Sequence, residues 1–264
     1  MCNRRCSAAM QTSAIAKDAP AGPQADIQHA LGALGYDGFR PGQQEAVLTL
    51  LQARRLLLVA PTGGGKSLCY QLPATMLAGT TVVISPLIAL MQDQVEALSK
   101  RGVAATFLAA TLSPDESRRR MRELARGAFK LVYVAPERLM FEGFRGLLHD
   151  LDVPLIAIDE AHCISEWGHD FRPEYMKIGE LLAEFAQVRV LACTATATPV
   201  VRDEILSRLR LPADTPQIVR GFARPNLALC VRDTQSAKER HALCEEMLHK
   251  ALKGPARRAG TAII

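Results

Sequence analysis

A short glycine-rich stretch offers the clearest chemistry in the sequence. The segment LLLVAPTGGGKSLCY (56–70) joins an apolar run to three glycines, a lysine and a serine. Backbone without side chains can wrap closely around a phosphate chain, and successive N–H groups turned inward bind its negative charge. Lys66 would place its ammonium on the terminal phosphates, and Ser67 would ligate a magnesium ion at the start of the following helix. The order of these parts predicts a triphosphate-binding P-loop, although Ala60 replaces the first glycine of the strict pattern.

Two acidic residues supply the partner that such a loop needs. The segment PLIAIDEAH (154–162) ends an apolar run with Asp159 and Glu160. Magnesium prefers oxygen ligands and keeps several waters, so one carboxylate, Asp159, suits it. Glu160 could then orient or deprotonate the attacking water, which favours hydrolysis over transfer. Acidic residues after a strand are also common helix caps. The pair therefore indicates a magnesium site only in combination with the glycine-rich loop.

Alternating strands and helices are needed to bring these residues together. Short apolar runs of the kind buried in parallel sheets are separated by segments with helical spacing. We expect strands at 56–60, 81–85, 131–135, 154–160 and 188–195, and helices at 87–102, 113–127 and 198–210. In the segment 113–127, Ser113 and Glu116 form a capping box, and Pro114 stands at the first helical position. The alternation predicts an α/β fold with a doubly wound parallel sheet, in which ligands bind beyond the carboxyl ends of the strands.

Composition limits the remaining possibilities only loosely. The 264 residues carry a formal net charge of +5, which permits an acidic partner such as nucleic acid but does not require one. The seven cysteines include no C-x-x-C pair, which argues against a paired zinc knuckle and fits reduced thiols in a reducing cytosol. No run of 18 apolar residues occurs, so we expect no membrane-spanning helix.

Three parts are expected along the chain. Residues 1–25, rich in Arg, Ser and Ala, are predicted to form a flexible tail, with an organelle transit peptide as the less favoured alternative. Residues 26–220 would form the nucleotide-binding domain. After Gly221, an apolar run at 226–233 and an amphipathic segment at 236–252 predict a strand and a helix. They read as the opening of a second α/β domain that is incomplete at Ile264.

Several blocks give the chain a resemblance to a known family. Residues 159–162 are Asp-Glu-Ala-His, and from Tyr36 to Asn226 the chain resembles the RecQ family of superfamily 2 DNA helicases. The blocks that carry the resemblance are LGALGYDGFRPGQQEAV (31–47), SPLIALMQDQ (85–94), APERL (135–139), AHCISEWGHDFRPEY (161–175), TATAT (194–198) and GFARPNL (221–227). The resemblance implies a RecA-like P-loop NTPase domain, with the last block as the hinge between two motor domains.

The resemblance also implies roles at the nucleotide. Tyr36 and Arg40 would sandwich the adenine and Gln43 would hydrogen-bond its edge, while Lys66, Asp159 and Glu160 would be catalytic. Ser67 and Asp159 would hold Mg²⁺. The full set expected to bind ATP is Tyr36, Arg40, Gln43, Thr62, Gly63, Gly64, Gly65, Lys66 and Ser67.

A second set of residues is implied to engage DNA and couple it to hydrolysis. In the aromatic-rich loop, Trp167 and Phe171 offer faces on which bases can stack, and His169 and Arg172 offer polar or cationic contacts. Thr194 and Thr196 match the coupling motif. His162, Cys163 and His169 also suggest zinc, but they lack a fourth ligand and a usual spacing. The arginine-rich segment 118–127 is more simply a solvated helix face than a DNA-binding surface.

The resemblance predicts a 3′-to-5′ DNA helicase that couples ATP hydrolysis to translocation and unwinding, with roles in DNA repair and recombination. Its cofactors would be ATP and Mg²⁺, and its partners single-stranded and partly duplex DNA. Such helicases need a second RecA-like domain to complete the site, so the chain alone is expected to bind ATP weakly and hydrolyse it slowly. The expected location is the bacterial cytoplasm or the eukaryotic nucleus, without secretion. The alternatives are an inert module that binds nucleotide or single-stranded DNA, and a P-loop kinase.

Overall fold

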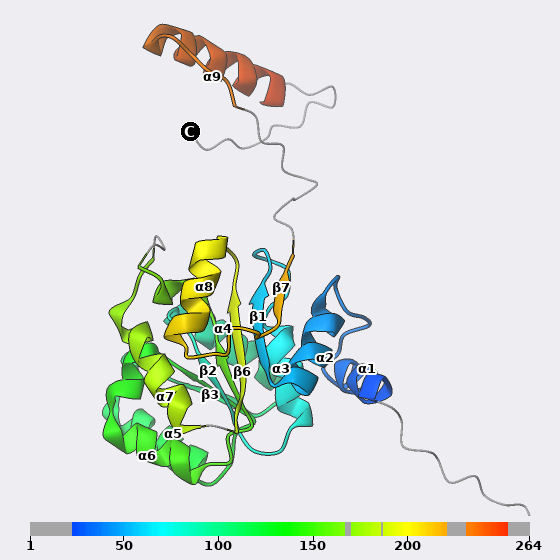
Figure 1. Cartoon of the computed structure of the whole chain (residues 1–264), viewed down its shortest axis with the longest axis vertical. Coiled ribbons are helices and arrows are strands. Elements are labelled where there is room, and N and C mark those ends of the chain that lie inside the picture. The colour runs from blue at the N-terminus through cyan, green and yellow to red at the C-terminus, as the bar shows by residue number, and fades with distance from the viewer. Residues whose placement is uncertain (1–22, 167–169, 186, 221–230, 253–264) are drawn as a thin grey trace, which may run out of the picture. The chain divides into compact units, whose positions relative to one another are not determined.

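The computed structural model describes residues 23–166, 170–185, 187–220 and 231–252 (Figure 1). The chain divides into two compact units, Met1–Phe222 and Ala223–Ile264. The first unit contains the sheet and the helices that cover it. The described part of the second unit contains α9 (Ala237–Leu252), which matches the helix predicted at 236–252.

A seven-stranded sheet organises the first unit, and every pair of neighbouring strands is parallel. The strand order is β3-β4-β2-β5-β6-β1-β7. The strands are β1 (Arg55–Val59), β2 (Thr81–Ile84), β3 (Ala105–Leu108), β4 (Leu131–Val134), β5 (Leu155–Ile158), β6 (Arg189–Thr194) and β7 (Gln217–Val219). The predicted α/β fold with a parallel sheet is therefore confirmed.

Alternate residues along the strands face two separate apolar cores. In β1, Leu57 and Val59 join one core, whereas Leu56 and Leu58 join the other. The first core is covered by α5 to α8 and the second by α1 to α4, so the sheet is doubly wound. These helices are α1 (Pro23–Ala33), α2 (Gln43–Ala53), α3 (Leu68–Met76), α4 (Ile88–Lys100), α5 (Pro114–Ala125), α6 (Glu142–Asp150), α7 (Ile178–Glu184) and α8 (Pro199–Arg208).

Side-chain caps fix the starts of two predicted helices. The Ser113 hydroxyl accepts a hydrogen bond from the Glu116 N–H at 3.2 Å, and a proline follows it at the first position of α5. The Thr198 hydroxyl does the same for the Val201 N–H at 3.4 Å at the start of α8. Each hydroxyl satisfies an N–H group that has no partner within the helix.

The sequence analysis did not predict two short strands of the sheet. Each of the five predicted strands is present with ends shifted by one or two residues, but β3 and β7 were not predicted. In β7 only Ile218 is buried, so three residues carry no readable period. The strand predicted at 226–233 is wrong over 231–233, where no strand forms and Val231 is 89% exposed. An apolar run becomes a strand only beside a partner strand; the rest of that segment lies outside the described residues.

The predicted tail at 1–25 needs a correction at its end. Residues 23–25 belong to α1, and residues 1–22 lie outside the described part of the chain. Within the described residues, no helix is long and apolar enough to cross a bilayer.

A helical glycine allows α7 to approach the end of α8. A Cβ added at Gly179 would lie 2.1 Å from the Arg208 carbonyl oxygen. We expect Gly179→Ala to lower the free energy of unfolding by about 1–3 kcal/mol, because the backbone must move to relieve the overlap. The matched control is Gly146→Ala in α6, where nothing lies within 4 Å. It should be neutral or stabilising by up to about 1 kcal/mol, because alanine is the better helix former.

Urea denaturation of the two variants would measure both effects. Equal stability of Gly179→Ala and the unaltered protein would contradict the close approach.

Candidate nucleotide-binding site

The site lies where three neighbouring strands end. β1 and β6 are paired with Val59 opposite Thr194, and β5 lies on the other side of β6. The Ala60 N–H continues the ladder by donating to the Thr194 carbonyl at 3.1 Å, and the Asp159 N–H donates to the Ile84 carbonyl at 2.8 Å. The parallel register therefore brings the glycine-rich loop and the acidic pair to one edge of the sheet.

The three loop glycines meet different steric demands. Gly63 (φ 80°) and Gly65 (φ 75°) adopt the left-handed conformation that favours glycine. A Cβ at Gly64 would lie 2.8 Å from the Pro61 carbonyl oxygen. Ala60 has no positive φ and is nearly buried, so an alanine is accommodated where the strict motif has glycine.

Lys66 lies next to the acidic pair. Its Nζ donates to the Ala60 carbonyl at 3.1 Å, which folds the side chain back along the loop. Its positive charge opposes the burial that raises the pKa of the Asp159 carboxyl, and it adds to the His162 hydrogen bond that lowers the pKa of the Glu160 carboxyl. Ser67 follows at the start of α3 and makes no capping bond to that helix with its side chain.

Asp159 is a carboxylate held away from water. It is 6% exposed, and its Oδ1 accepts from the Cys193 thiol at 3.4 Å and from the Glu160 N–H at 3.1 Å. Burial raises the pKa of the Asp159 carboxyl, and the neighbouring Glu160 carboxylate raises it further. A hard divalent cation would offset that penalty, so the donor set fits magnesium.

Glu160 has an unusual backbone and a defined partner. Its φ of 48° and ψ of 46° are left-handed, which is uncommon for a residue other than glycine. Its Oε2 lies 3.3 Å from the His162 Nδ1, and the hydrogen bond from His162 lowers the pKa of the Glu160 carboxyl. Strained backbone of this kind is concentrated at functional sites.

The same histidine reaches the end of β6. The His162 Nδ1 lies 2.8 Å from the Thr194 Oγ1. That hydroxyl donates to the Thr196 carbonyl at 3.2 Å and accepts from the Thr196 N–H at 3.3 Å. Glu160, His162, Thr194 and Thr196 thus form one polar chain across two strand ends.

The residues expected at adenine line a cavity of about 240 Å³ beside the loop. The buried Gln43 donates to the Gly65 carbonyl at 2.9 Å and accepts from the Arg40 N–H at 2.7 Å. The Arg40 guanidinium donates to the Gly63 carbonyl. The Tyr36 ring is faced instead by the guanidinium of Arg101, 4.2 Å from its centroid.

Arg101 is a lining residue that the sequence interpretation missed. It follows the last turn of α4, and nothing in its spacing relates it to Tyr36. The structure places the Arg40 guanidinium on the loop and the Arg101 guanidinium over the Tyr36 ring, and the sandwich of adenine between Tyr36 and Arg40 stays a prediction.

The residues expected to engage DNA are described only in part. Trp167 and His169 lie outside the described residues. Phe171 is 37% exposed, and the Arg172 N–H donates to the Cys163 carbonyl at 2.8 Å. The Arg172 guanidinium reaches the Pro86 carbonyl at 3.4 Å, which links this loop to the segment 85–94.

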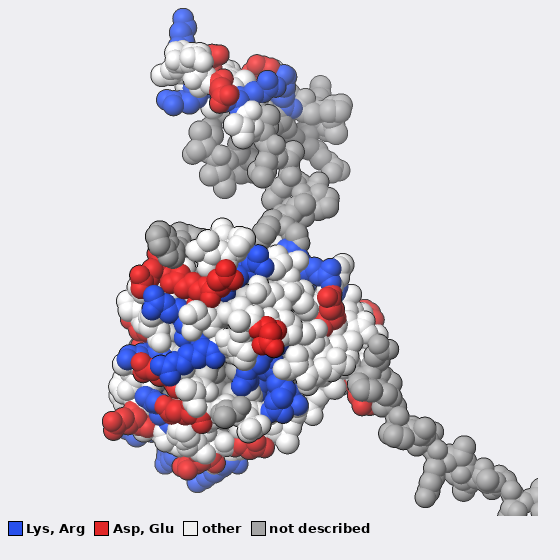
Figure 2. All heavy atoms as spheres, in the orientation of Figure 1, with Lys and Arg blue, Asp and Glu red and all other residues white. Residues whose placement is uncertain are grey.

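Basic side chains do not mark a nucleic-acid surface by themselves. In α5, Arg118 pairs with Asp115, while Arg119 and Arg120 both pair with Glu116, as expected for a solvated helix face. On the face drawn in Figure 2, basic and acidic side chains are interspersed over the first unit.

Comparisons with known proteins agree on one family. Residues 40–204 match the family described as DEAD/DEAH box helicase. The chain is 50% identical over 199 residues to the ATP-dependent DNA helicase RecQ of Bacillus subtilis (strain 168), which covers 75% of this chain and 34% of the relative. It is 42% identical over 224 residues to the ATP-dependent DNA helicase RecQ of Pasteurella multocida (strain Pm70), covering 84% of this chain and 34% of the relative. The chain thus spans 34% of the length of each of these curated relatives.

Solved structures with low sequence identity share the fold. A hypothetical ATP-dependent RNA helicase from Sulfolobus tokodaii superposes with a TM-score of 0.56 at 18% identity, covering 74% of this chain and 57% of that chain. The DUF1998 helicase MrfA bound to DNA gives a TM-score of 0.57 at 21% identity, covering 74% and 29%.

The contacts of Gln43 predict a role in holding the loop. We expect Gln43→Ala to weaken ATP affinity about tenfold, because each lost hydrogen bond contributes about 0.5–1.5 kcal/mol. Titration with a fluorescent ATP analogue would measure the change. Gln52→Ala, an exposed position on the same helix, serves as the control and should bind normally. Unchanged affinity in Gln43→Ala would show that the loop holds its shape without this amide.

Proposed function

The chain belongs to the DEAD/DEAH box helicase family, and from that premise we propose that it provides the ATP-binding domain of an ATP-dependent DNA helicase of the RecQ type. In the proposal, residues 26–220 bind and hydrolyse ATP. Residues 221–264 form a hinge and the start of a second RecA-like domain. The partners are single-stranded and partly duplex DNA, with 3′-to-5′ translocation as in the family it resembles.

One observation carries the proposal. The glycine-rich loop and the acidic pair leave neighbouring strands at one edge of the sheet, where the Ala60 N–H donates to the Thr194 carbonyl at 3.1 Å and the Asp159 N–H donates to the Ile84 carbonyl at 2.8 Å. An anion-binding loop beside two carboxylates of different environment suits a nucleotide whose phosphates bring negative charge and a divalent cation. Ser67 and Asp159 would hold Mg²⁺, which when bound would neutralise charge on the β- and γ-phosphates.

The two carboxylates then take different roles. Asp159 is buried, and a bound cation would stabilise its negative charge there. Glu160 has a side chain that is 22% exposed, and its pKa is held low, so it stays ionised and can orient or deprotonate a water. Gly63, Gly64, Gly65 and Thr62 supply the loop backbone around the phosphates.

Base recognition is assigned to the cavity beside the loop. Tyr36, Arg40 and Gln43 would contact adenine, and Arg101 lies ready to extend that contact because it already faces Tyr36. An aromatic ring and a guanidinium plane both stack on a flat base.

DNA would act on hydrolysis through the polar chain that begins at Glu160. His162 connects that carboxylate to Thr194 and Thr196, the two residues of the coupling motif. Trp167, His169, Phe171 and Arg172 would contact single-stranded DNA and transmit its presence to Glu160. The proposed function would be carried out in the bacterial cytoplasm or the eukaryotic nucleus, where DNA is located.

The test measures ATP hydrolysis in a hybrid helicase. Residues of this chain would replace the segment of the Bacillus subtilis RecQ helicase to which they are similar. We expect single-stranded DNA to stimulate ATP hydrolysis in the hybrid. Glu160→Gln should lower turnover by about 10²–10⁴-fold, because the water loses its general base, while ATP still binds. The control Glu123→Gln, on the solvated face of α5, should keep full turnover.

Other outcomes point to the other two functions. ATP binding with no stimulation by DNA would favour an inert binding module. Transfer of labelled γ-phosphate to an acceptor other than water would favour a kinase.

A further inference from the structure

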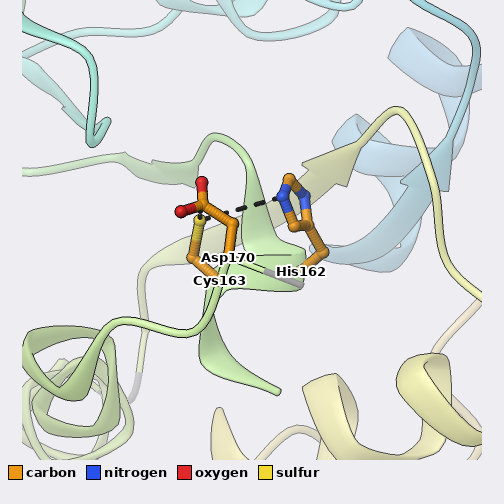
Figure 3. Close-up of side chains that lie close together, drawn as sticks. All are labelled: His162, Cys163 and Asp170. Carbon is orange, nitrogen blue, oxygen red and sulfur yellow. Dashed lines mark hydrogen bonds between the residues drawn. The ribbon is translucent and has the colours of Figure 1, made fainter. Parts of the chain in front are cut away.

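Three metal-ligating side chains meet beside the acidic pair. His162 and Cys163 lie in the 3₁₀ turn η2 (Ala161–Ile164), and Asp170 lies farther along the chain (Figure 3). The Cys163 thiol donates to the Asp170 Oδ2 at 3.6 Å, and its sulfur lies 3.9 Å from the His162 Nε2. All three ligand atoms lie within 4.8 Å of one another.

The two separations from the Cys163 sulfur come close to the edges of a zinc tetrahedron. Zinc binds thiolate at about 2.3 Å and imidazole or carboxylate at about 2.0–2.1 Å, which places neighbouring ligand atoms about 3.6 Å apart. The observed sulfur–oxygen and sulfur–nitrogen distances, 3.6 and 3.9 Å, need only small side-chain rotations to meet that value.

The second nitrogen of the histidine is already held as a zinc-bound imidazole requires. A metal on Nε2 leaves Nδ1–H to be bonded by a carboxylate or another oxygen, which fixes the ring. Here Nδ1 lies 2.8 Å from the Thr194 Oγ1 and 3.3 Å from the Glu160 Oε2. This arrangement does not depend on the thiol or the Asp170 carboxylate, and it is compatible with a metal on Nε2.

We propose that His162, Cys163 and Asp170 form a binding site for a divalent transition-metal ion of the Zn²⁺ class. The fourth position is open to water or a nucleotide oxygen. The sulfur is buried, whereas the Asp170 side chain is 50% exposed and gives the ion a route from solvent. One soft sulfur with one nitrogen selects zinc over Mg²⁺, which prefers oxygen ligands alone.

The thiol must lose its proton when the metal binds. Burial, and next to it the Asp170 carboxylate, raises the pKa of the Cys163 thiol to about 12. The ion therefore displaces a proton from sulfur, and binding is weaker than in sites with several preformed thiolates.

The site would restrain the residue to which the proposed function assigns water activation. With zinc on Nε2, the His162 Nδ1 carries a hydrogen that it donates to Glu160 or Thr194. This consequence rests on the proposed function: zinc would hold the ring in the form whose Nδ1–H bonds Glu160 and Thr194. Metal binding itself needs no nucleotide, so its test stands apart from the test of the helicase proposal.

Cobalt titration of the full chain tests the site directly. Co²⁺ occupies zinc sites and gives a thiolate-to-metal charge-transfer band. We expect one Co²⁺ per chain with such a band, and Zn²⁺ should displace it. Cys163→Ala should abolish the band, and Asp170→Asn should weaken Co²⁺ binding by at least about tenfold.

The control variants separate this site from the other thiols of the chain. Cys244→Ala should keep the band, because Cys163 is the one thiol of the cluster among the described residues. The double variant Cys2→Ala/Cys6→Ala, at positions outside the described residues, should keep it as well if His162, Cys163 and Asp170 hold the ion. Circular dichroism would show that each variant is folded. Should Cys163→Ala not fold, Asp170→Asn decides the question, since its side chain is half exposed.

Three results would overturn the proposal. The first is the lack of a thiolate band in the unaltered chain. The second is a band that survives Cys163→Ala or is lost in the Cys2→Ala/Cys6→Ala variant. The third is normal affinity in a folded Asp170→Asn variant.

Discussion

Opposite charges must be balanced at the edge where β1, β5 and β6 end. Asp159 is buried, and its carboxyl has a raised pKa even with Lys66 nearby. A buried carboxylate is tolerated only with hydrogen bonds or a cation, and a glycine-rich loop ahead of a helix can bind an anion through its N–H groups. The glycine-rich loop can bind the phosphates of a nucleotide, and the buried Asp159 carboxylate can bind its magnesium ion. A magnesium nucleotide would therefore balance the charge of both. The parallel sheet sets the geometry, because its register puts the loop and the carboxylate at one edge.

The long, periodic features were predictable from the sequence. Five strands and three helices were placed to within one or two residues, because apolar runs and helical spacing extend over enough residues to be read. The strand β7 was not, since only one of its three residues is buried. The strand β3 was not either, although it is as long as β2, β4 and β5, because Ala105 and Thr106 weaken its apolar run. At the site, the glycine-rich loop and the acidic pair were predictable because the residues of each are contiguous in the sequence and follow an apolar run. Arg101 approaches Tyr36 only through the packing of α4, and no spacing in the chain signals it.

The His162 ring lies between the acidic pair, the end of β6 and the Cys163 thiol. Through Nδ1 it reaches Glu160 and Thr194, and through Nε2 it approaches Cys163. In the proposed function, the first set would relate ATP hydrolysis to the residues at the end of β6. The second relates the same ring to Asp170, at the border of the loop assigned to DNA. A single imidazole thus lies where signals from nucleotide, DNA and a metal ion would converge.

Calorimetric titration of ATP, with and without Mg²⁺, tests the central account most directly. The account predicts single-site binding that Mg²⁺ strengthens, with the enhancement lost in Asp159→Asn and binding itself lost in Lys66→Ala. Lys100→Ala, an exposed lysine paired with Glu96, should behave as the unaltered protein does. Full Mg²⁺ enhancement in Asp159→Asn, or normal ATP affinity in Lys66→Ala, would contradict it.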